Sequence, residues 1–147
     1  MLEPGPGMGF FTIPLARLVG SSGHVVAVDL QPRMIDGLKR RAAKQGVLDR
    51  IDARVCPVES MGVGDLAATV DFTLAFAIVH EFPDAGRFFN EVAVASKRGA
   101  QLLVADPSGH VNDTQFDAEL SSAAAAGFDV VSRPMIRRSH TALLVKR

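Results

Sequence analysis

Three glycines stand at alternate positions near the start of the chain, in the stretch "EPGPGMGFF" at residues 3–11. Gly5, Gly7 and Gly9 carry no Cβ, and glycine reaches backbone conformations with positive φ at little steric cost. A turn built in this way leaves room for another group to press directly against the main chain. The spacing predicts a turn that holds a ligand, with a purely structural tight turn as the alternative.

An acidic residue follows where nucleotide-binding folds place one. The run "HVVAVD" at 24–29 predicts a strand that ends in Asp29, about twenty residues after the glycines, where an acid meets ribose hydroxyls. The run "FFTIPLARLV" predicts a helix from Phe10, with Pro14 in the first turn, where backbone donors have no partner within the helix. Together these features predict an adenosine-type cofactor at the carboxyl edge of a sheet.

Glu3 and Phe10 separate two cofactor classes. The nicotinamide dinucleotide pattern G-x-G-x-x-G needs a glycine where this chain has Phe10. Glu3, directly before the turn, would also stand beside the pyrophosphate, whereas its carboxylate suits a cofactor that carries an ammonium group. An NAD(P)-dependent reductase is therefore the less favoured alternative.

The rest of the chain alternates between strand-like and helical patterns. Nearly continuous apolar runs, typical of parallel strands buried on both faces, lie at 24–29, 50–56, 70–79 and 100–106. Helical patterns lie between them: one runs from Pro32 to Gly46, one contains Phe88 and Phe89 and closes at 97–99, and one runs from a capping box at Asn112 to Gly127. This alternation predicts an α/β fold with a parallel sheet.

The end of the chain breaks the alternation. Two strand-like runs at 128–134 and 140–147 are separated by about five residues, too few for a parallel crossover. They predict an antiparallel hairpin. The whole chain, 1–147, is predicted to be one domain: a doubly wound, mostly parallel sheet that ends in this hairpin.

Four stretches of the chain resemble motifs of the class I S-adenosylmethionine-dependent methyltransferases, in particular the small-molecule, ubiquinone-biosynthesis-like branch. "LEPGPGMG" and "VVAVD" resemble the motifs of the first two strands, and "VHEFPD" and "LLVADPSGH" those after the fourth and fifth. The resemblance covers essentially the whole chain. It implies a Rossmann-like sheet of order 3-2-1-4-5-7-6, S-adenosyl-L-methionine (SAM) as cofactor, and methyl transfer to a small-molecule acceptor.

The same resemblance implies which residues bind SAM. The glycines would lie against its methionine part, Glu3 would bind its amino group, Asp29 the ribose hydroxyls, and Leu30 would flank the adenine. Where the family often has an acid that reads the adenine edge, this chain has Pro57, so the neighbouring Val58 or Glu59 is expected there instead. The implied set is Glu3, Gly5, Gly7, Gly9, Asp29, Leu30, Val58, Glu59, Ala75 and Phe76.

Methyl transfer from a sulfonium needs alignment of the acceptor more than it needs a catalytic group. His80 follows the fourth predicted strand, where the acceptor should lie, and is the candidate base; packing within a loop is the alternative. Glu81 is expected at the surface. Asp106 and His110, after the fifth strand, are further candidates from the same edge of the sheet.

Composition narrows the partners. Lys plus Arg and Asp plus Glu both number 16, so no overall field attracts nucleic acid or an anionic membrane, and the basic clusters at 39–41 and 137–138 are expected to be a helix end and a solvated loop. The single Cys56 excludes an internal disulfide framework and a multi-cysteine metal site, disfavours arsenite as acceptor, and favours the cytoplasm. No metal, nucleic acid or membrane is expected.

Members of the resembled family carry a helical stretch before the first motif, and none precedes it here. We therefore expect Phe10, Phe11 and Phe76 to be exposed, and the chain to self-associate or to be only marginally stable. A non-catalytic cofactor-binding or interaction module is the main alternative to an enzyme.

Overall fold

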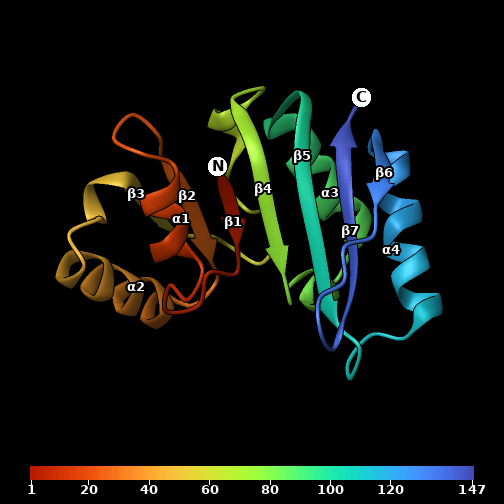
Figure 1. Ribbon diagram of the computed structural model, residues 1–147, viewed down its shortest axis with the longest axis horizontal. Coiled ribbons are helices and arrows are strands. Elements are labelled where there is room, and N and C mark those ends of the chain that lie inside the picture. The colour runs from red at the N-terminus through yellow and green to blue at the C-terminus, as the bar shows by residue number, and fades with distance from the viewer. The chain divides into compact units, whose positions relative to one another are not determined.

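The computed structural model describes all residues from 1 to 147 and contains two compact units, 1–62 and 63–147 (Figure 1). The first unit consists of β1 (Leu2–Pro4), α1 (Thr12–Leu18), β2 (Val25–Asp29), α2 (Pro32–Lys44), the 3-10 turn η1 (Leu48–Arg50) and β3 (Ile51–Val55). The second consists of η2 (Gly64–Leu66), β4 (Val70–Phe76), η3 (Val79–Glu81), α3 (Ala85–Ala95), β5 (Ser96–Pro107), α4 (Asp113–Ala125), β6 (Phe128–Ser132) and β7 (Ser139–Lys146). That the chain is one domain stays a prediction.

The strand order is β3-β2-β1-β4-β5-β7-β6, which confirms the predicted fold class. Within the first unit β1 pairs with β2 and β2 with β3, both in parallel. Within the second, β4 and β5 are parallel, whereas β7 is antiparallel to both β5 and β6. The short connection from β6 to β7 thus forms the predicted antiparallel hairpin.

The core of the first unit lies on one face of its strands. Val25 and Ala27 alternate along β2, so both side chains point to the same face. Ile13 of α1 and Leu38 of α2 belong to the same buried cluster, so both helices cover this one face. This packing fixes the turn that joins β1 to α1.

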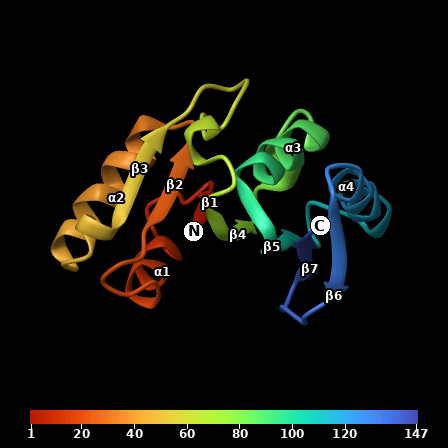
Figure 2. The same cartoon turned by 90° about the horizontal axis from the view of Figure 1, so that it is seen from above.

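The core of the second unit is built from paired apolar residues of β5 and β7. Leu102 is the register partner of Leu144 and Val104 that of Ala142, and all four side chains are fully buried. Figure 2 shows α3 and α4 on the same side of these strands. The two helices contribute the fully buried rings of Phe88, Phe89 and Phe116.

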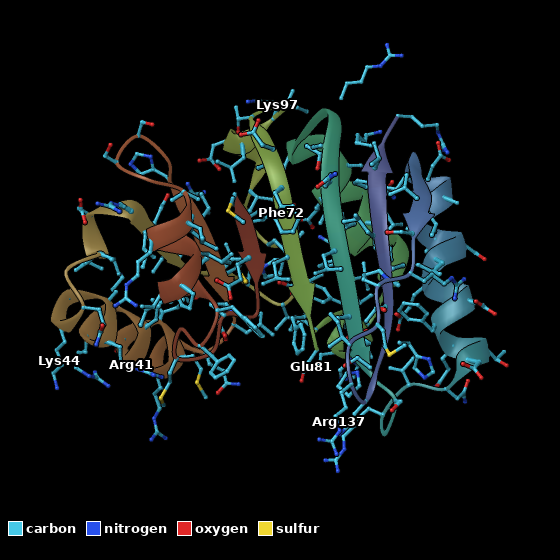
Figure 3. The ribbon with its side chains drawn as sticks, in the orientation of Figure 1. Arg41, Lys44, Phe72, Glu81, Lys97 and Arg137 are labelled. Carbon is cyan, nitrogen blue, oxygen red and sulfur yellow. The ribbon has the colours of Figure 1, made fainter.

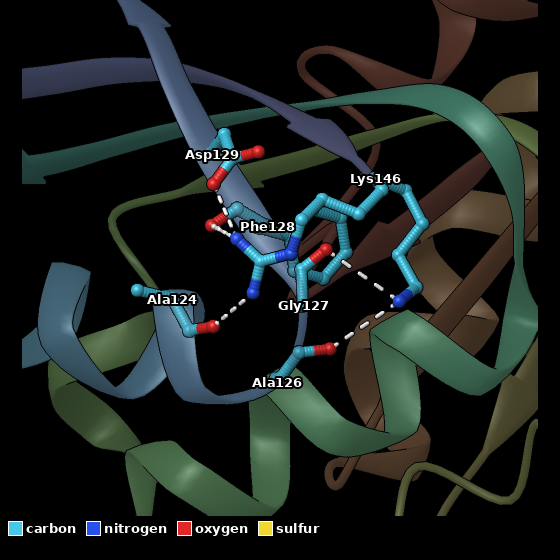
Figure 4. A network of polar contacts seen from close by, with 7 residues as sticks. Ala124, Ala126, Gly127, Phe128, Asp129 and Lys146 are labelled. Atoms are coloured by element: carbon cyan, nitrogen blue, oxygen red, sulfur yellow. Dashed lines mark hydrogen bonds and ion pairs between the residues drawn. The ribbon is translucent and has the colours of Figure 1, made fainter.

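The C-terminal residues close the end of α4 (Figure 4). Arg147 Nη2 donates to the Ala124 carbonyl at 2.7 Å, and its other terminal nitrogen pairs with Asp129. Lys146 Nζ lies 3.5 Å from the Gly127 carbonyl oxygen. Because the last carbonyls of a helix carry partial negative charge, two cations here stabilise α4 and the start of β6.

The two basic clusters lie where the sequence predicts. Residues 39–41 belong to the C-terminal part of α2, and Figure 3 shows Arg41 and Lys44 directed away from that helix. Arg137 and Arg138 are exposed in the loop between β6 and β7. No helix of the structure has the length and apolar character needed to cross a membrane.

Several element ends differ from the predictions. The helix predicted from Phe10 begins at Thr12, and β3 ends at Val55, which leaves Cys56 half-buried beyond the strand rather than within it. Residues 97–99, predicted to close α3, belong to β5 instead, because the chain becomes extended at Ser96, whose hydroxyl donates to the Val92 carbonyl.

The expected exposure of the three phenylalanines is also only partly correct. Phe10 has 75% of its surface exposed, but Phe11 and Phe76 are half-buried. The Phe11 ring packs edge-on against Phe10 with 4.9 Å between the ring centroids, which covers part of it.

Candidate functional site

The turn between β1 and α1 has the backbone geometry that its glycines predict. Gly5, Gly7 and Gly9 have φ values of 67°, 53° and 89°. The Gly5 amide donates to the Val28 carbonyl at 2.9 Å, which extends the pairing of β1 with β2, and the Gly9 amide donates to the Pro6 carbonyl at 3.0 Å. All three glycines are therefore required by positive φ.

Gly7 and Gly9 differ in what surrounds them. A Cβ added at Gly7 would have no neighbouring atom within 4 Å, whereas one added at Gly9 would lie 2.5 Å from Cδ1 of Leu38 on α2. Gly9 thus allows α2 to pack closely against the turn. Gly7 instead leaves open space beside the backbone, which is what a ligand in contact with this turn requires.

Glu3, at the end of β1, is a buried acid with an unused oxygen. Only 3% of the residue is exposed, and its Oε2 has no hydrogen-bond partner. Burial raises the pKa of the Glu3 carboxyl to about 7. A buried carboxyl of this kind is suited to receive a cationic donor such as an ammonium group.

Thr12 was not predicted from the sequence. Its side chain is fully buried in the first turn of α1, and its Oγ1 also lacks a partner. A threonine directly after a glycine turn commonly caps a helix, so its residue type alone gave no signal of a second unsatisfied polar atom beside Glu3.

The predicted adenosine contacts lie at the carboxyl ends of β2 and β3, which are neighbouring parallel strands. Asp29 ends β2, and its Oδ1 accepts a hydrogen bond from the Gln31 amide at 2.8 Å. Leu30 follows with about half of its surface exposed, and Val58 and Glu59 lie on the exposed turn after β3. The structure thus places these four residues at the same edge, and their contacts with a cofactor stay predictions.

The remaining predicted residues belong to the second unit. Ala75 is fully buried near the end of β4, and Phe76, its last residue, is half-buried. Ala77 follows, and its amide donates to the Ala105 carbonyl at 2.7 Å. Its φ of 54° departs from the extended conformation, so the strand ends before the predicted residue 79. Contacts of Ala75 and Phe76 with a cofactor stay predictions.

His80 and Asp106 form a pair at the carboxyl ends of β4 and β5. Asp106 is fully buried and its Oδ1 lies 3.0 Å from Nδ1 of His80. The same carboxylate accepts backbone hydrogen bonds from Ile78 at 3.0 Å and from His80 at 3.1 Å. The ring of His110 lies 5.7 Å from that of His80. Glu81 is exposed near the end of β4, as predicted (Figure 3).

Glu119 on α4 was also not predicted, although it contacts this pair. It is 8% exposed, its Oε2 has no partner, and it lies near Asp106. Burial and, to a lesser extent, the charge of Asp106 raise the pKa of Glu119 to about 8. A signal existed in the sequence, because Glu119 interrupts the apolar stripe of Phe116, Leu120 and Ala123 on the buried face of α4.

Known proteins with related sequences and structures point to one family. The chain matches the family model of the methyltransferase domain over residues 1–134. It is 25% identical over 134 residues to an arsenite methyltransferase from Halobacterium salinarum, a match that covers 89% of this chain and 34% of the relative. It is 32% identical over 105 residues to a ubiquinone biosynthesis O-methyltransferase from Methylocella silvestris, covering 71% of this chain and 38% of that enzyme.

Solved structures show the same fold. A SAM-dependent methyltransferase from Aquifex aeolicus superposes with a TM-score of 0.81 at 23% identity, over 98% of this chain and 79% of that one. The chain spans only 34% and 38% of the length of the two curated relatives above. Because the family model covers all but the last residues, the chain belongs to the methyltransferase domain family.

Proposed function

We propose that this chain binds SAM and transfers its methyl group to a small-molecule acceptor. The observation that carries the proposal is the buried, unpaired Oε2 of Glu3 beside a turn where Gly7 leaves open space. The amino group of SAM would satisfy this oxygen, and a main chain without a Cβ would accept its methionine part. Membership of the methyltransferase domain family supports the same activity.

The residues of the first unit fit the remaining parts of SAM. Asp29 has one oxygen engaged by the Gln31 amide, which orients the carboxylate and leaves Oδ2 for ribose hydroxyls. Leu30 offers exposed apolar surface for the adenine, and Val58 or Glu59 would contact its edge. SAM would supply an electrophilic methyl carbon on a sulfonium, and the chain would hold and align the reactants.

The proposed acceptor is a small molecule, because the equal numbers of acidic and basic residues give no field for nucleic acid or a membrane surface. The single Cys56 is the reason for a proposed cytoplasmic location.

The exposed Phe10 ring gives a second copy of the chain an apolar contact, and self-association is part of the proposal. Sedimentation measurements test that part.

The proposed cofactor is tested by titration calorimetry with S-adenosylhomocysteine (SAH), the product form of SAM, with NADH as a negative control. SAH should bind and NADH should not. Asp29→Ala should weaken SAH binding by about 1.5–3 kcal/mol, the scale of lost hydrogen bonds to a charged group. Asp36→Ala, an exposed acid on α2, is the matched control and should leave affinity unchanged. Equal affinity of wild type and Asp29→Ala would exclude Asp29 from the site.

A non-catalytic cofactor-binding module is the second candidate, since it would retain the same glycine turn and Glu3. The two candidates differ only in turnover. Slow hydrolysis of SAM, or transfer of its labelled methyl group, by the wild-type chain supports an enzyme. This turnover should be absent from a variant that no longer binds SAH. Binding of SAH without any turnover of SAM over a panel of acceptors supports the binding module.

A further inference from the structure

The carboxylate of Asp106 is contacted by nitrogen atoms of Ile78 and His80, at the start of η3. Oδ1 faces the Ile78 amide and the imidazole Nδ1 of His80, and Oδ2 faces the His80 amide. Glu119 reaches the same carboxylate from α4. The contacts from Ile78 and His80 engage three of the roughly four lone-pair sites of the carboxylate.

This arrangement fixes the direction of each hydrogen bond. An ionised carboxylate only accepts, so the ring nitrogen of His80 that faces it has to be the one that carries hydrogen. A neutral imidazole with hydrogen on Nδ1 has a lone pair on Nε2, and no contact of the structure engages Nε2 of His80. Burial and the charge of Asp106 raise the pKa of Glu119, so this neighbour is neutral and leaves the negative charge on Asp106.

We propose that Asp106 is a positioning residue that holds His80 as the Nδ1–H tautomer, so that Nε2 serves as the base for a methyl acceptor whose attacking atom carries a proton. The class of acceptor is therefore an alcohol, a phenol or an N–H compound. The acceptor class rests on the proposed function, whereas the tautomer of His80 does not.

The proposed step balances in atoms and charge. The acceptor oxygen or nitrogen forms a bond to the methyl carbon as the carbon–sulfur bond breaks. The electron pair of the broken bond remains on sulfur. The proton of the acceptor passes to Nε2 of His80, which becomes an imidazolium beside the Asp106 carboxylate. Loss of that proton to solvent restores the base.

Other titratable groups lie against this site and serve as controls. His110 packs against the ring of His80, but no hydrogen bond joins it to Asp106. His140 on β7 is the register partner of Asp106, its ring lies 5.6 Å from that of Phe116, and its Nδ1 is 3.3 Å from the carboxylate of Asp113. Neither ring replaces His80 at Asp106.

The tautomer is measured on the cofactor-free chain by nitrogen–proton correlation spectra of ¹⁵N-labelled histidine, at a pH where the ring of His80 is neutral. In the wild type the Nδ1–H form should exceed the Nε2–H form by about tenfold or more, because only the former gains the charge-assisted hydrogen bond to Asp106. A wild-type spectrum in which the Nε2–H form predominates overturns the proposal.

Three variants separate positioning from folding. Asp106→Asn should lose the preference for the Nδ1–H form, since an amide can present a donor to the ring. Glu119→Gln, which retains a neutral donor, and His110→Gln, which removes only the adjacent ring, should both keep it. A Glu119→Gln or His110→Gln spectrum that changes as Asp106→Asn does would contradict the assignment of the preference to Asp106. SAH titrations of the same samples report separately on the proposed function.

Discussion

Gly7 and Gly9 stand two residues apart and share positive φ, yet they serve different purposes. Any side chain at Gly9 meets Leu38, so that glycine permits packing, whereas a side chain at Gly7 enters open space. We expect Gly7→Val to abolish SAH binding, because the added methyl groups occupy the space assigned to the cofactor. The positive φ adds a stability cost of about 1–2 kcal/mol. Calorimetry and circular dichroism measure the two effects.

Gly46 provides the control for the backbone cost. It follows α2 with φ of 66° and has no atom within 4 Å of an added Cβ. Gly46→Val should lower stability by a similar amount and leave SAH affinity unchanged. If Gly7→Val bound SAH as tightly as Gly46→Val does, the turn would have only a structural role.

We expect Glu3 to make SAH binding dependent on pH. In the free protein the pKa of Glu3 is raised to about 7 by burial, so the carboxyl is largely protonated at pH 6. An ammonium group favours the ionised form, so binding at pH 6 should release a proton, and affinity should rise with pH by up to about tenfold per unit below 7. Calorimetry at pH 6 in buffers of different ionisation enthalpy counts the released proton.

Glu3→Gln tests the origin of that proton. The amide keeps the shape of the side chain but does not titrate, so proton release and the pH dependence below 7 should both disappear, together with a loss of affinity. Release of the same proton by Glu3→Gln would assign it to another group.

At the scale of elements, side-chain hydrogen bonds stabilise α4 at both ends. At its start the Asn112 side chain accepts from the Gln115 amide and the Gln115 side chain accepts from the Asn112 amide, both at 2.9 Å. Asn112→Ala should therefore reduce the free energy of unfolding by about 1 kcal/mol in denaturant titrations. Asn90→Ala, at an exposed position on α3, should cause no such loss. Equal effects of the two substitutions would mean that the cap contributes nothing.

Local signals are what made the elements predictable from sequence. The capping box at Asn112, the short connection before Ser139 and the acid that ends β2 each lie within a few residues, and all are found in the structure. Thr12 and Glu119 matter because of buried neighbours on other elements, Glu3 on β1 and Asp106 on β5, and a pattern of residue types does not contain such neighbours. The same holds for the end of α3, where strand pairing takes residues 97–99 into β5.

For the whole molecule, the two buried glutamates predict that stability falls as pH rises. The pKa of Glu3 is raised to about 7 and that of Glu119 to about 8, from 4.5 in both cases. Below pH 4.5 both carboxyls are protonated in the folded and the unfolded chain, and their contribution is fully present. Between pH 4.5 and 8 the unfolded chain loses protons that the folded chain keeps, so this contribution is lost progressively.

The prediction is tested by urea unfolding at a series of pH values between 5 and 9. Glu3→Gln should flatten the decline mainly up to pH 7, and Glu119→Gln up to pH 8, because a glutamine remains neutral in both states. Their effects should add in the double variant, since Glu3 lies beside Thr12 and Glu119 beside Asp106 and they share no partner. Glu81→Gln, at an exposed position, should leave the profile unchanged. A double variant whose stability declines with pH as steeply as that of the wild type would show that neither glutamate is protonated in the folded chain.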